Sequence, residues 1–247
     1  MPRFLIATVC VTFVFLNTNF LETSLGDSVD LSAARDNTLY EAPTDLSNGA
    51  GDFFFVGRTG GGDERRGLLL FDLSPIPVGA TINSVSLELV VSQANATTVD
   101  IGLHRLFSDW GESTSDAPGG EGAGTAAEVG DATWQHTFFP GSFWNTAGGD
   151  FASTASANQF VDGPATYTWQ SGQLASDVQG WLDGTVDNFG WALVTDATGS
   201  GTAKRFNSRE NNLGSPILRV DFTAVPEPTS VLVLSAIACV TSLRRKR

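Results

Sequence analysis

Three tryptophans and one histidine are the residues of this sequence best suited to recognise a ligand. Trp110, Trp134 and Trp144 stand in a stretch rich in glycine and alanine, and His136 follows Trp134 closely. An indole face can cover the apolar face of a pyranose ring, and an imidazole can hydrogen-bond its hydroxyl groups. The same indoles could instead be buried, because hiding apolar surface stabilises a core by about 25 cal/mol per Å². Carbohydrate binding and core packing are therefore both open for these residues.

The other tryptophans and the second histidine have ordinary structural explanations. Trp169, Trp181 and Trp191 stand on regular elements and are expected in the core. His104 stands on the polar face of a strand, where we expect it to be solvated or hydrogen-bonded. With only two histidines, far apart in the chain, a His-rich metal centre is excluded. A structural calcium ion stays an open alternative without named ligands, because no spacing such as an EF-hand loop occurs; no other cofactor is expected.

Catalytic motifs are absent from the sequence. It has no Gly-x-Ser-x-Gly elbow, no Walker A loop and no His-Glu-x-x-His helix, and residues 119–124 (GGEGAG) fail the dinucleotide pattern. A polysaccharide lyase needs a base near a sugar C5 proton and a group that neutralises the neighbouring carboxylate. Tyr167, His136 and the arginines could nominally supply them. A polysaccharide lyase or hydrolase is kept as a minor alternative to a non-catalytic protein.

Residues 206–210 (FNSRE) place arginine and glutamate side by side just before the last expected strand. A guanidinium can bind the carboxylate of an anionic sugar through two parallel hydrogen bonds. The same geometry lets Arg209 pair with a carboxylate of its own domain, and we favour this internal pairing.

The first segment of the chain has the pattern of a secretory signal peptide. An early cation, Arg3, precedes an uninterrupted apolar run over residues 4–16, although no clean Ala-x-Ala site follows. We expect a signal peptide over residues 1–24, with an open cleavage point. Both cysteines, Cys10 and Cys239, fall in the two terminal segments, so we expect a mature domain without disulfides or thiol chemistry.

The last segment, residues 225–247, has three parts. Pro226, Glu227 and Pro228 are followed by an uncharged run over residues 229–243 and by four cations. As a helix that run spans roughly 22 Å, which is short of the roughly 30 Å hydrocarbon core of a membrane. The cations should stay on the cytoplasmic side and leave the body exported. These cations are Arg244, Arg245, Lys246 and Arg247.

This order of Pro-Glu-Pro, apolar helix and basic terminus resembles the PEP-CTERM sorting signal of Gram-negative bacteria. The resemblance implies export through the secretion translocon, transient membrane insertion of the C-terminal helix, and recognition and removal of the signal by an exosortase. An ordinary tail anchor is the alternative. The implied location is a membrane-associated precursor, then the cell surface or extracellular matrix.

The body between the two segments, residues 25–224, is long enough for one domain with a sizeable core. The whole chain has a formal net charge of −13, and the body is more acidic still because Arg3 and the four terminal cations lie outside it. Such a surface repels nucleic acid and anionic lipid headgroups. We therefore expect no nucleic-acid partner.

Alternating apolar residues predict strands through most of the body. Val85, Leu87, Leu89 and Val91 should point inward, while residues 67–73 (GLLLFDL) are apolar on both faces. The expected strands are 36–41, 53–57, 67–73, a strand containing 85–91, 98–106, 166–169, 189–195, 204–208 and 217–222.

Two stretches depart from this pattern. Residues 171–183 (SGQLASDVQGWLD) place Leu174, Val178 and Trp181 on one helical face, which predicts a single helix ended by Gly184. Residues 108–156 lose all alternation and predict a long loop region, with one brief strand over 133–138. About nine or ten strands with one helix predict an all-β, antiparallel β-sandwich, and their number suits a jelly roll.

Several fragments of the body then fall in one family's order. DNTLYE, RRGLLLFDLSPIPVGATINSVSLELVV, HRLFSDWGES, DATWQHTFFPGSFWNTAGGDF, NFGWALV and FNSRENNLGSPILRVDF together resemble a DNRLRE-type jelly-roll domain over residues 36–222. The resemblance implies a secreted or surface β-sandwich, some members being carbohydrate-binding modules beside polysaccharide-degrading enzymes. No catalytic domain accompanies it in this sequence.

These observations lead to one main hypothesis of function. We expect an exported, non-catalytic surface or matrix protein that binds or is embedded in extracellular polysaccharide. A purely structural or adhesive biofilm scaffold is the alternative, and a polysaccharide-degrading enzyme is a third.

Overall fold

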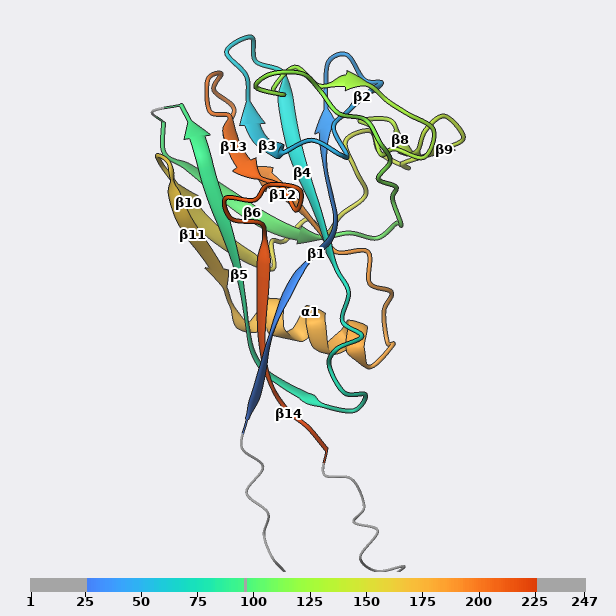
Figure 1. Cartoon of the computed structure of the whole chain (residues 1–247), viewed down its shortest axis with the longest axis vertical. Coiled ribbons are helices and arrows are strands. Elements are labelled where there is room, and N and C mark those ends of the chain that lie inside the picture. Colours follow the sequence, from blue (N-terminus) through green and yellow to red (C-terminus); the bar gives the residue numbers. More distant parts are fainter. Residues whose placement is uncertain (1–25, 96, 226–247) are drawn as a thin grey trace, which may run out of the picture.

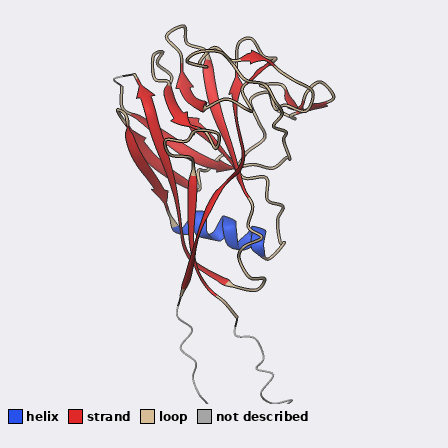
Figure 2. Ribbon diagram, viewed as in Figure 1, coloured by secondary structure: helices blue, strands red, loops and turns tan. Residues whose placement is uncertain are grey.

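The computed structural model describes residues 26–95 and 97–225 (Figure 1). Over these residues the chain forms fourteen strands, paired antiparallel, and one helix. The all-β class with a single helix is thereby confirmed (Figure 2). The apolar helices expected in the two terminal segments, 1–24 and 225–247, fall outside the described residues apart from Val225.

In chain order the strands are β1 (Asp27–Tyr40), β2 (Leu46–Ser47), β3 (Phe53–Arg58), β4 (Glu64–Phe71), β5 (Thr81–Ala94), β6 (Val99–Arg105), β7 (Thr125–Ala126), β8 (His136–Phe138), β9 (Ser142–Phe143), β10 (Ala157–Val161), β11 (Ala165–Gln170), β12 (Trp191–Thr195), β13 (Lys204–Asn207) and β14 (Ile217–Thr223), and the helix α1 (Gly172–Leu182) lies between β11 and β12.

The long strands form two antiparallel layers that face each other. The first layer contains the start of β1 with β14, β5, β13, β3 and β11, and the second contains the end of β1 with β4, β12, β6 and β10. Strand β1 belongs to both layers. Its first residues pair with β14, and after a bulge between Ala33 and Arg35 it continues along β4. Together with a short contact between β3 and β4, this strand joins the layers into a barrel-like sheet.

The core between the layers follows the predicted alternation. Val85, Leu87, Leu89 and Val91 of β5 are buried in it, as expected from their spacing. Phe54 and Phe206 stack across the paired strands β3 and β13 with ring centroids 5.2 Å apart. Trp169, Trp181 and Trp191, predicted to lie in the core, are all buried in this cluster.

The second layer is buried on its outer face as well. Along β4, Leu69 and Phe71 point into the main core, whereas Leu68 points outward into a second apolar cluster. The irregular chain between β6 and β10 covers this outer face (Figure 1). The prediction that residues 67–73 are apolar on both faces is therefore confirmed. The second cluster consists of Leu39, Leu68, Leu106, Trp110, Ala132, Trp134, Trp144 and Ala192.

The sequence did not predict the start of β1, strand β10 or the two-residue strands β2, β7 and β9. Strand β1 begins at Asp27 rather than at residue 36, and its first half exposes aspartates and serines on one face. Strand β10 at the sheet edge buries only Ala157 and Val161. In the first half of β1, Val29, Leu31 and Ala33 alternate with exposed polar residues, a period-two pattern that the predicted boundary at residue 36 missed. Strand β10 carries too little apolar alternation to be recognised locally, and it forms because β6 offers its backbone groups. In the loop region, the brief strand expected over 133–138 is confined to β8.

Helix α1 forms where it was predicted and lies across one end of the layers (Figure 1). The Ser171 side chain caps it by accepting a hydrogen bond from the Leu174 backbone N–H at 2.9 Å. Gly184, with a φ of 65°, follows its C-terminal cap. Its apolar face also carries a buried acid, Asp177, which accepts hydrogen bonds from Trp191 Nε1 at 3.0 Å and from the Ser156 hydroxyl.

We predict that Asp177→Ala lowers the free energy of unfolding by about 2–4 kcal/mol, because it leaves the buried donors of Trp191 and Ser156 without an acceptor. Urea unfolding measures this quantity. Asp187→Ala, which removes an exposed carboxylate, is the control and should change it by less than about 0.5 kcal/mol. Equal effects of the two substitutions would contradict the role given to Asp177.

Candidate ligand-binding groove

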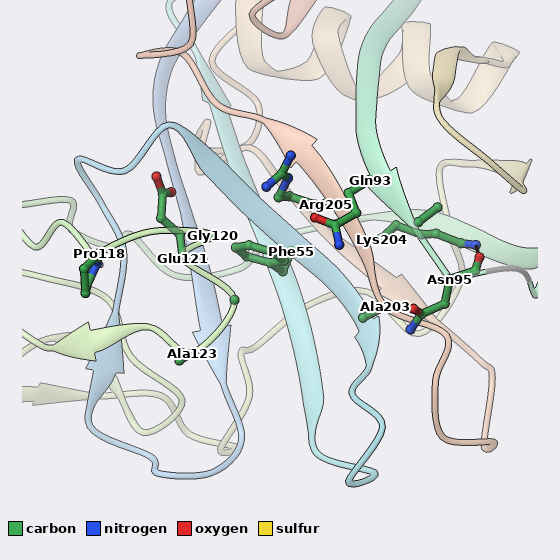
Figure 3. A pocket seen from close by; sticks show the side chains of 12 residues that line it. Phe55, Gln93, Asn95, Pro118, Gly120, Glu121, Ala123, Ala203, Lys204 and Arg205 are labelled. Atoms are coloured by element: carbon green, nitrogen blue, oxygen red, sulfur yellow. Dashed lines mark hydrogen bonds between the residues drawn. The ribbon is translucent and has the colours of Figure 1, made fainter.

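A groove of about 370 Å³ opens on the outer face of the first layer, where β3, β13 and β5 lie side by side (Figure 3). Phe55 stands opposite Arg205 in the strand register, and Arg205 stands opposite Gln93, so the three side chains form a row across the strands. Phe54 and Phe206, their neighbours in sequence, point the other way into the core. The groove is lined by Phe55, Gln93, Ala94, Asn95, Pro118, Gly120, Glu121, Gly122, Ala123, Ala203, Lys204 and Arg205.

One side of the groove is a glycine-rich wall, residues 118–123. Glu121 in this wall has a φ of 62° and is the single non-glycine residue with positive φ in the described part of the chain. Its carboxylate points inward and accepts hydrogen bonds from Asn48 Nδ2 at 2.8 Å and from the Phe53 N–H at 2.9 Å. The Tyr40 hydroxyl donates to the Glu121 carbonyl oxygen at 3.2 Å. These bonds fix the wall and supply a reason for the unfavourable backbone conformation.

Arg205 is the free cation of the groove. Its Nε donates to the Ser92 hydroxyl at 3.0 Å, and its guanidinium carbon lies 3.8 Å from the centre of the Phe53 ring. Its two terminal nitrogens have no hydrogen-bond partner among the described residues. The side chain is thus held in place while its outer donors stay available to a ligand.

Lys204 also borders the groove, but its charge is used inside the protein. The residue is fully buried, and its Nζ donates to the carbonyl oxygens of Asn95, Thr97 and Asp162 at 2.6–2.7 Å. Burial lowers the pKa of Lys204, against the opposing charge of Asp162. All three ammonium hydrogens are therefore used within the protein. Lys204 connects the β5–β6 turn to the β10–β11 turn and has no donor left for a ligand.

The groove therefore offers binding groups rather than catalytic ones. Gln93 and Asn95 are exposed amides, Arg205 adds donors, and the largely covered Phe55 ring adds an apolar floor. Glu121 is the sole carboxylate in the lining, and its oxygens accept hydrogen bonds from the protein itself. Such a set suits a ligand rich in hydroxyl groups.

The tryptophans weighed as a sugar platform lie elsewhere, in the cluster over the second layer. Trp110 is fully buried and its Nε1 donates to the Phe189 carbonyl oxygen at 2.9 Å, while Trp144 Nε1 donates to Thr133 O at 2.9 Å. Trp134 is 8% exposed. A stacking platform needs open indole faces, which these three side chains do not have. Their positions support the packing alternative.

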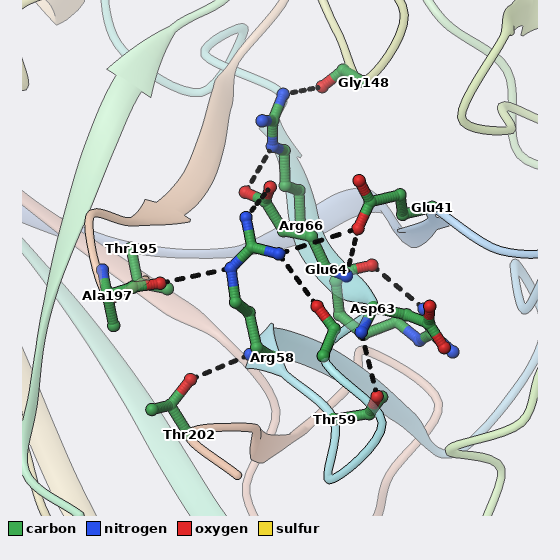
Figure 4. A network of polar contacts seen from close by, with 12 residues as sticks. Glu41, Arg58, Thr59, Asp63, Glu64, Arg66, Gly148, Thr195, Ala197 and Thr202 are labelled. Carbon is green, nitrogen blue, oxygen red and sulfur yellow. Dashed lines mark hydrogen bonds and ion pairs between the residues drawn. The ribbon is translucent and has the colours of Figure 1, made fainter. Parts of the chain in front are cut away.

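Trp134 is covered by Arg66 from β4, whose contacts with Glu64 and Gly148 are drawn in Figure 4. The guanidinium carbon of Arg66 lies 4.7 Å from the indole centre, and its nitrogens bond Glu64 at 2.9 Å and the Gly148 carbonyl oxygen at 2.7 Å. Glu64 in turn pairs with Arg58 at 3.1 Å. This network fastens the Trp134 loop to the second layer.

His136 is buried with Trp134 rather than placed in a catalytic site. Its Nδ1 lies 2.9 Å from the Thr133 hydroxyl, its ring packs 4.3 Å from that of Phe143, and burial lowers its pKa. Tyr167, the other nominal lyase residue, lies on β11 in the first layer and uses its hydroxyl within the β10–β11 turn. The structure does not bring the two together.

The internal pairing favoured for Arg209 is confirmed. Arg209 bonds Glu112 at 2.7 Å and Glu210 at 2.8 Å, and its backbone N–H donates to the fully buried Asp36 at 2.7 Å. Burial raises the pKa of Asp36 well above its ordinary value, and burial raises the pKa of Glu112 to about 7 against the hydrogen bond from Arg209. Two carboxyl groups, those of Glu112 and Glu210, thus share the Arg209 guanidinium, and a third, that of Asp36, accepts the Arg209 backbone N–H.

The predicted sorting residues lie outside the described residues: Pro226, Glu227, Pro228, Arg244, Arg245, Lys246 and Arg247. Within the described ranges, no three His, Cys, Asp or Glu side chains gather in a way that could hold a metal ion. No helix of that part is long and apolar enough to cross a membrane.

Fold and groove together describe an all-β protein with an open groove on the outer face of one layer. No family model matches the chain, and no curated protein matches it. The groove residues Phe55, Gln93 and Arg205 were not found from the sequence, because their alignment depends on pairing between distant strands. A local signal did exist in the GGEGAG stretch, whose acid among glycines forms the wall.

We predict that Trp134→Ala and Trp144→Ala each lower the free energy of unfolding by about 3–5 kcal/mol, because each leaves a cavity in the second cluster. Retention on polysaccharide, measured per folded molecule on an affinity column, should not change. Phe143→Ala, at a ring that is 62% exposed, is the control for stability. Loss of retention with unchanged stability would instead identify an indole platform.

We predict that Glu112, paired with Arg209, makes the protein more stable at pH 5 than at pH 8. The pKa of Glu112 is raised from 4.5 to about 7 in the folded protein, so protonation of Glu112 stabilises the fold. This contribution to the free energy of unfolding is fully present below pH 4.5 and is lost as the pH rises through 7. The full effect is roughly 3 kcal/mol. The measurement is the free energy of unfolding in urea at pH 5 and at pH 8. Glu112→Gln should remove most of the Glu112 contribution to the difference between these two values. An unchanged difference would contradict the raised pKa of Glu112.

Proposed function

We propose that this protein is an exported, non-catalytic surface or matrix protein that binds extracellular polysaccharide in the groove between β13 and the glycine-rich wall. The observation that carries the proposal is the groove itself, where the unpaired Arg205 donors and two exposed amides border an apolar floor. A pinned wall keeps this arrangement preorganised, which lowers the entropic cost of binding.

The fold supports this function through the resemblance to DNRLRE-type jelly-roll domains. Two antiparallel layers with a short helix are compatible with that topology. Asn37 of the DNTLYE fragment is buried. Its Nδ2 donates to the Ser47 hydroxyl at 2.9 Å, and its Oδ1 accepts from the Asn48 N–H at 3.1 Å. In our account the DNTLYE fragment therefore serves the fold, and ligand contact falls to the groove.

Sorting by an exosortase is the second part of the proposal. β1 and β14 pair, so residues 26 and 225 leave the domain at the same end (Figure 1). Thr81 pairs with Thr223 at that end of β5, whereas Gln93 lies twelve residues further along, roughly 40 Å away. A precursor held in the membrane by its C-terminal segment would thus present the groove away from the membrane. Cleavage near Pro226–Pro228 would then release it to the surface or matrix.

A structural or adhesive scaffold is the alternative, and the burial of all three candidate indoles favours it. The enzymatic alternative has less support, because the groove lining holds no free acid or base.

We predict that Arg205→Gln weakens retention of the mature exported protein on an extracellular polysaccharide by about 1.5–3 kcal/mol, since it removes charged donors. A panel of neutral and acidic polysaccharides gives the measurement. Arg219→Gln is the matched control: it makes the same charge change on the same layer, at an exposed residue paired with Asp30. Equal retention of both variants would refute polysaccharide binding in the groove. If the protein is retained on no polysaccharide, the structural or adhesive scaffold is the function that stands.

A further inference from the structure

A second pocket, of about 310 Å³, opens on the outer face of the other layer, where β12, β6 and β10 are neighbours. Asp100, Gly102 and His104 of β6 point outward into it, because the intervening residues Ile101 and Leu103 point into the core. The other lining residues are Ser153, Ala155, Asn158, Val194, Thr195 and Asp196.

The absence of a side chain at Gly102 lets two polar side chains lie close to the backbone in this pocket. A Cβ at this position would lie 2.7 Å from His104 Nε2 and 2.9 Å from Asn158 Oδ1. Gly102 therefore leaves room for the His104 ring and the Asn158 amide, which bring Nε2 and Oδ1 together in the lining of the pocket.

His104 presents an acceptor to this pocket. Its Nδ1 lies 2.7 Å from the Ala152 carbonyl oxygen, which can only accept a hydrogen bond. Nδ1 therefore carries the hydrogen, and in the neutral ring Nε2 carries the lone pair. That lone pair belongs to the nitrogen beside Gly102.

Two carboxylates add further acceptors without a balancing cation. Asp100 Oδ1 is buried and has no hydrogen-bond partner, and burial, then the nearby charge of Asp196, raises the pKa of Asp100. No ion pair in the described part of the chain involves either aspartate. An unpaired buried carboxylate oxygen is costly unless a donor reaches it. The pocket thus presents three acceptor groups and lacks a cation of its own.

An exposed aromatic ring stands beside these acceptors. Phe160 on β10 is directly opposite Asp100 in the register and is 67% exposed. Directly opposed residues on paired strands have Cβ atoms about 5 Å apart on the same face. Its ring can therefore cover the apolar face of a sugar whose polar substituent enters the pocket.

We propose that this second pocket binds the primary ammonium group of an amino sugar, with the pyranose ring against Phe160. An ammonium has three donors and one positive charge, which match the lone pair of His104 and the carboxylates of Asp100 and Asp196. A metal ion is not favoured, since these groups do not gather as metal ligands would. N-acetylation removes both the charge and two of the donors, so the pocket should reject acetylated units. The inference does not rest on the first groove.

The test is calorimetric titration of the mature protein with a glucosamine tetrasaccharide and with its fully N-acetylated counterpart. We expect binding of the free-amine form alone. Asp100→Asn and Asp196→Asn should each weaken it at least about tenfold, and Phe160→Ala should also weaken it. Asp187→Asn, at an exposed carboxylate outside the pocket, should leave the affinity within about twofold.

Asp100→Asn, Asp196→Asn and Asp187→Asn each remove one negative charge, so their comparison separates specific from nonspecific binding. A cationic oligosaccharide adhering nonspecifically to this acidic protein would lose the same affinity with Asp187→Asn as with the two pocket variants, and that result would overturn the proposal. Equal binding of the acetylated sugar, or no binding, would also overturn it. Arg205→Gln should leave amino-sugar binding unchanged, so failure of the pocket and failure of the groove are distinguishable. Asp196 is exposed, so its variant is expected to fold even if Asp100→Asn does not.

Discussion

Burial of both faces of the second layer is the constraint on which the rest of the structure depends. Leu69 and Phe71 face the main core, so Leu68 and its outward neighbours need a cover of their own. The irregular chain between β6 and β10 provides it, held by its own backbone hydrogen bonds and anchored by large indoles whose burial adds to the stabilisation. The tryptophans are consequently taken up by packing. Surface open to a ligand is left on the outer face of the first layer and at the β6–β10 edge of the second.

Charged side chains with satisfied partners hold the irregular parts in place. Glu121 fixes the wall of the groove, Lys204 connects the β5–β6 and β10–β11 turns, and Arg66 fastens the Trp134 loop to β4. A buried charge is expensive unless it is fully hydrogen-bonded, so each of these residues favours one arrangement of its loop over the alternatives. These contacts, together with regular strand pairing, fix the shape of the groove and of the second pocket.

Local sequence patterns predicted the elements whose burial has a single period. The alternation around Val85 and the capped helix from Gly172 to Leu182 are examples. Strand β10 could not be predicted, because Ala157 and Val161 are its only buried residues. Long-range contacts determine the features that local patterns did not predict. The sequence around a loop tryptophan does not show whether its indole is covered or open. In the all-apolar FFFV run, no local signal shows on which face of the sheet Phe55 lies. The row of Phe55, Arg205 and Gln93 exists only through the register of three distant strands.

Hydrogen–deuterium exchange of the mature protein, with and without a retained polysaccharide, tests most directly where the ligand binds. We predict slower exchange in peptides that cover the glycine-rich wall (118–123) and strand β13, with no change over residues 133–148. Slower exchange over 133–148 with an unchanged wall would contradict it, because binding would then involve the tryptophan cluster that the structure assigns to packing.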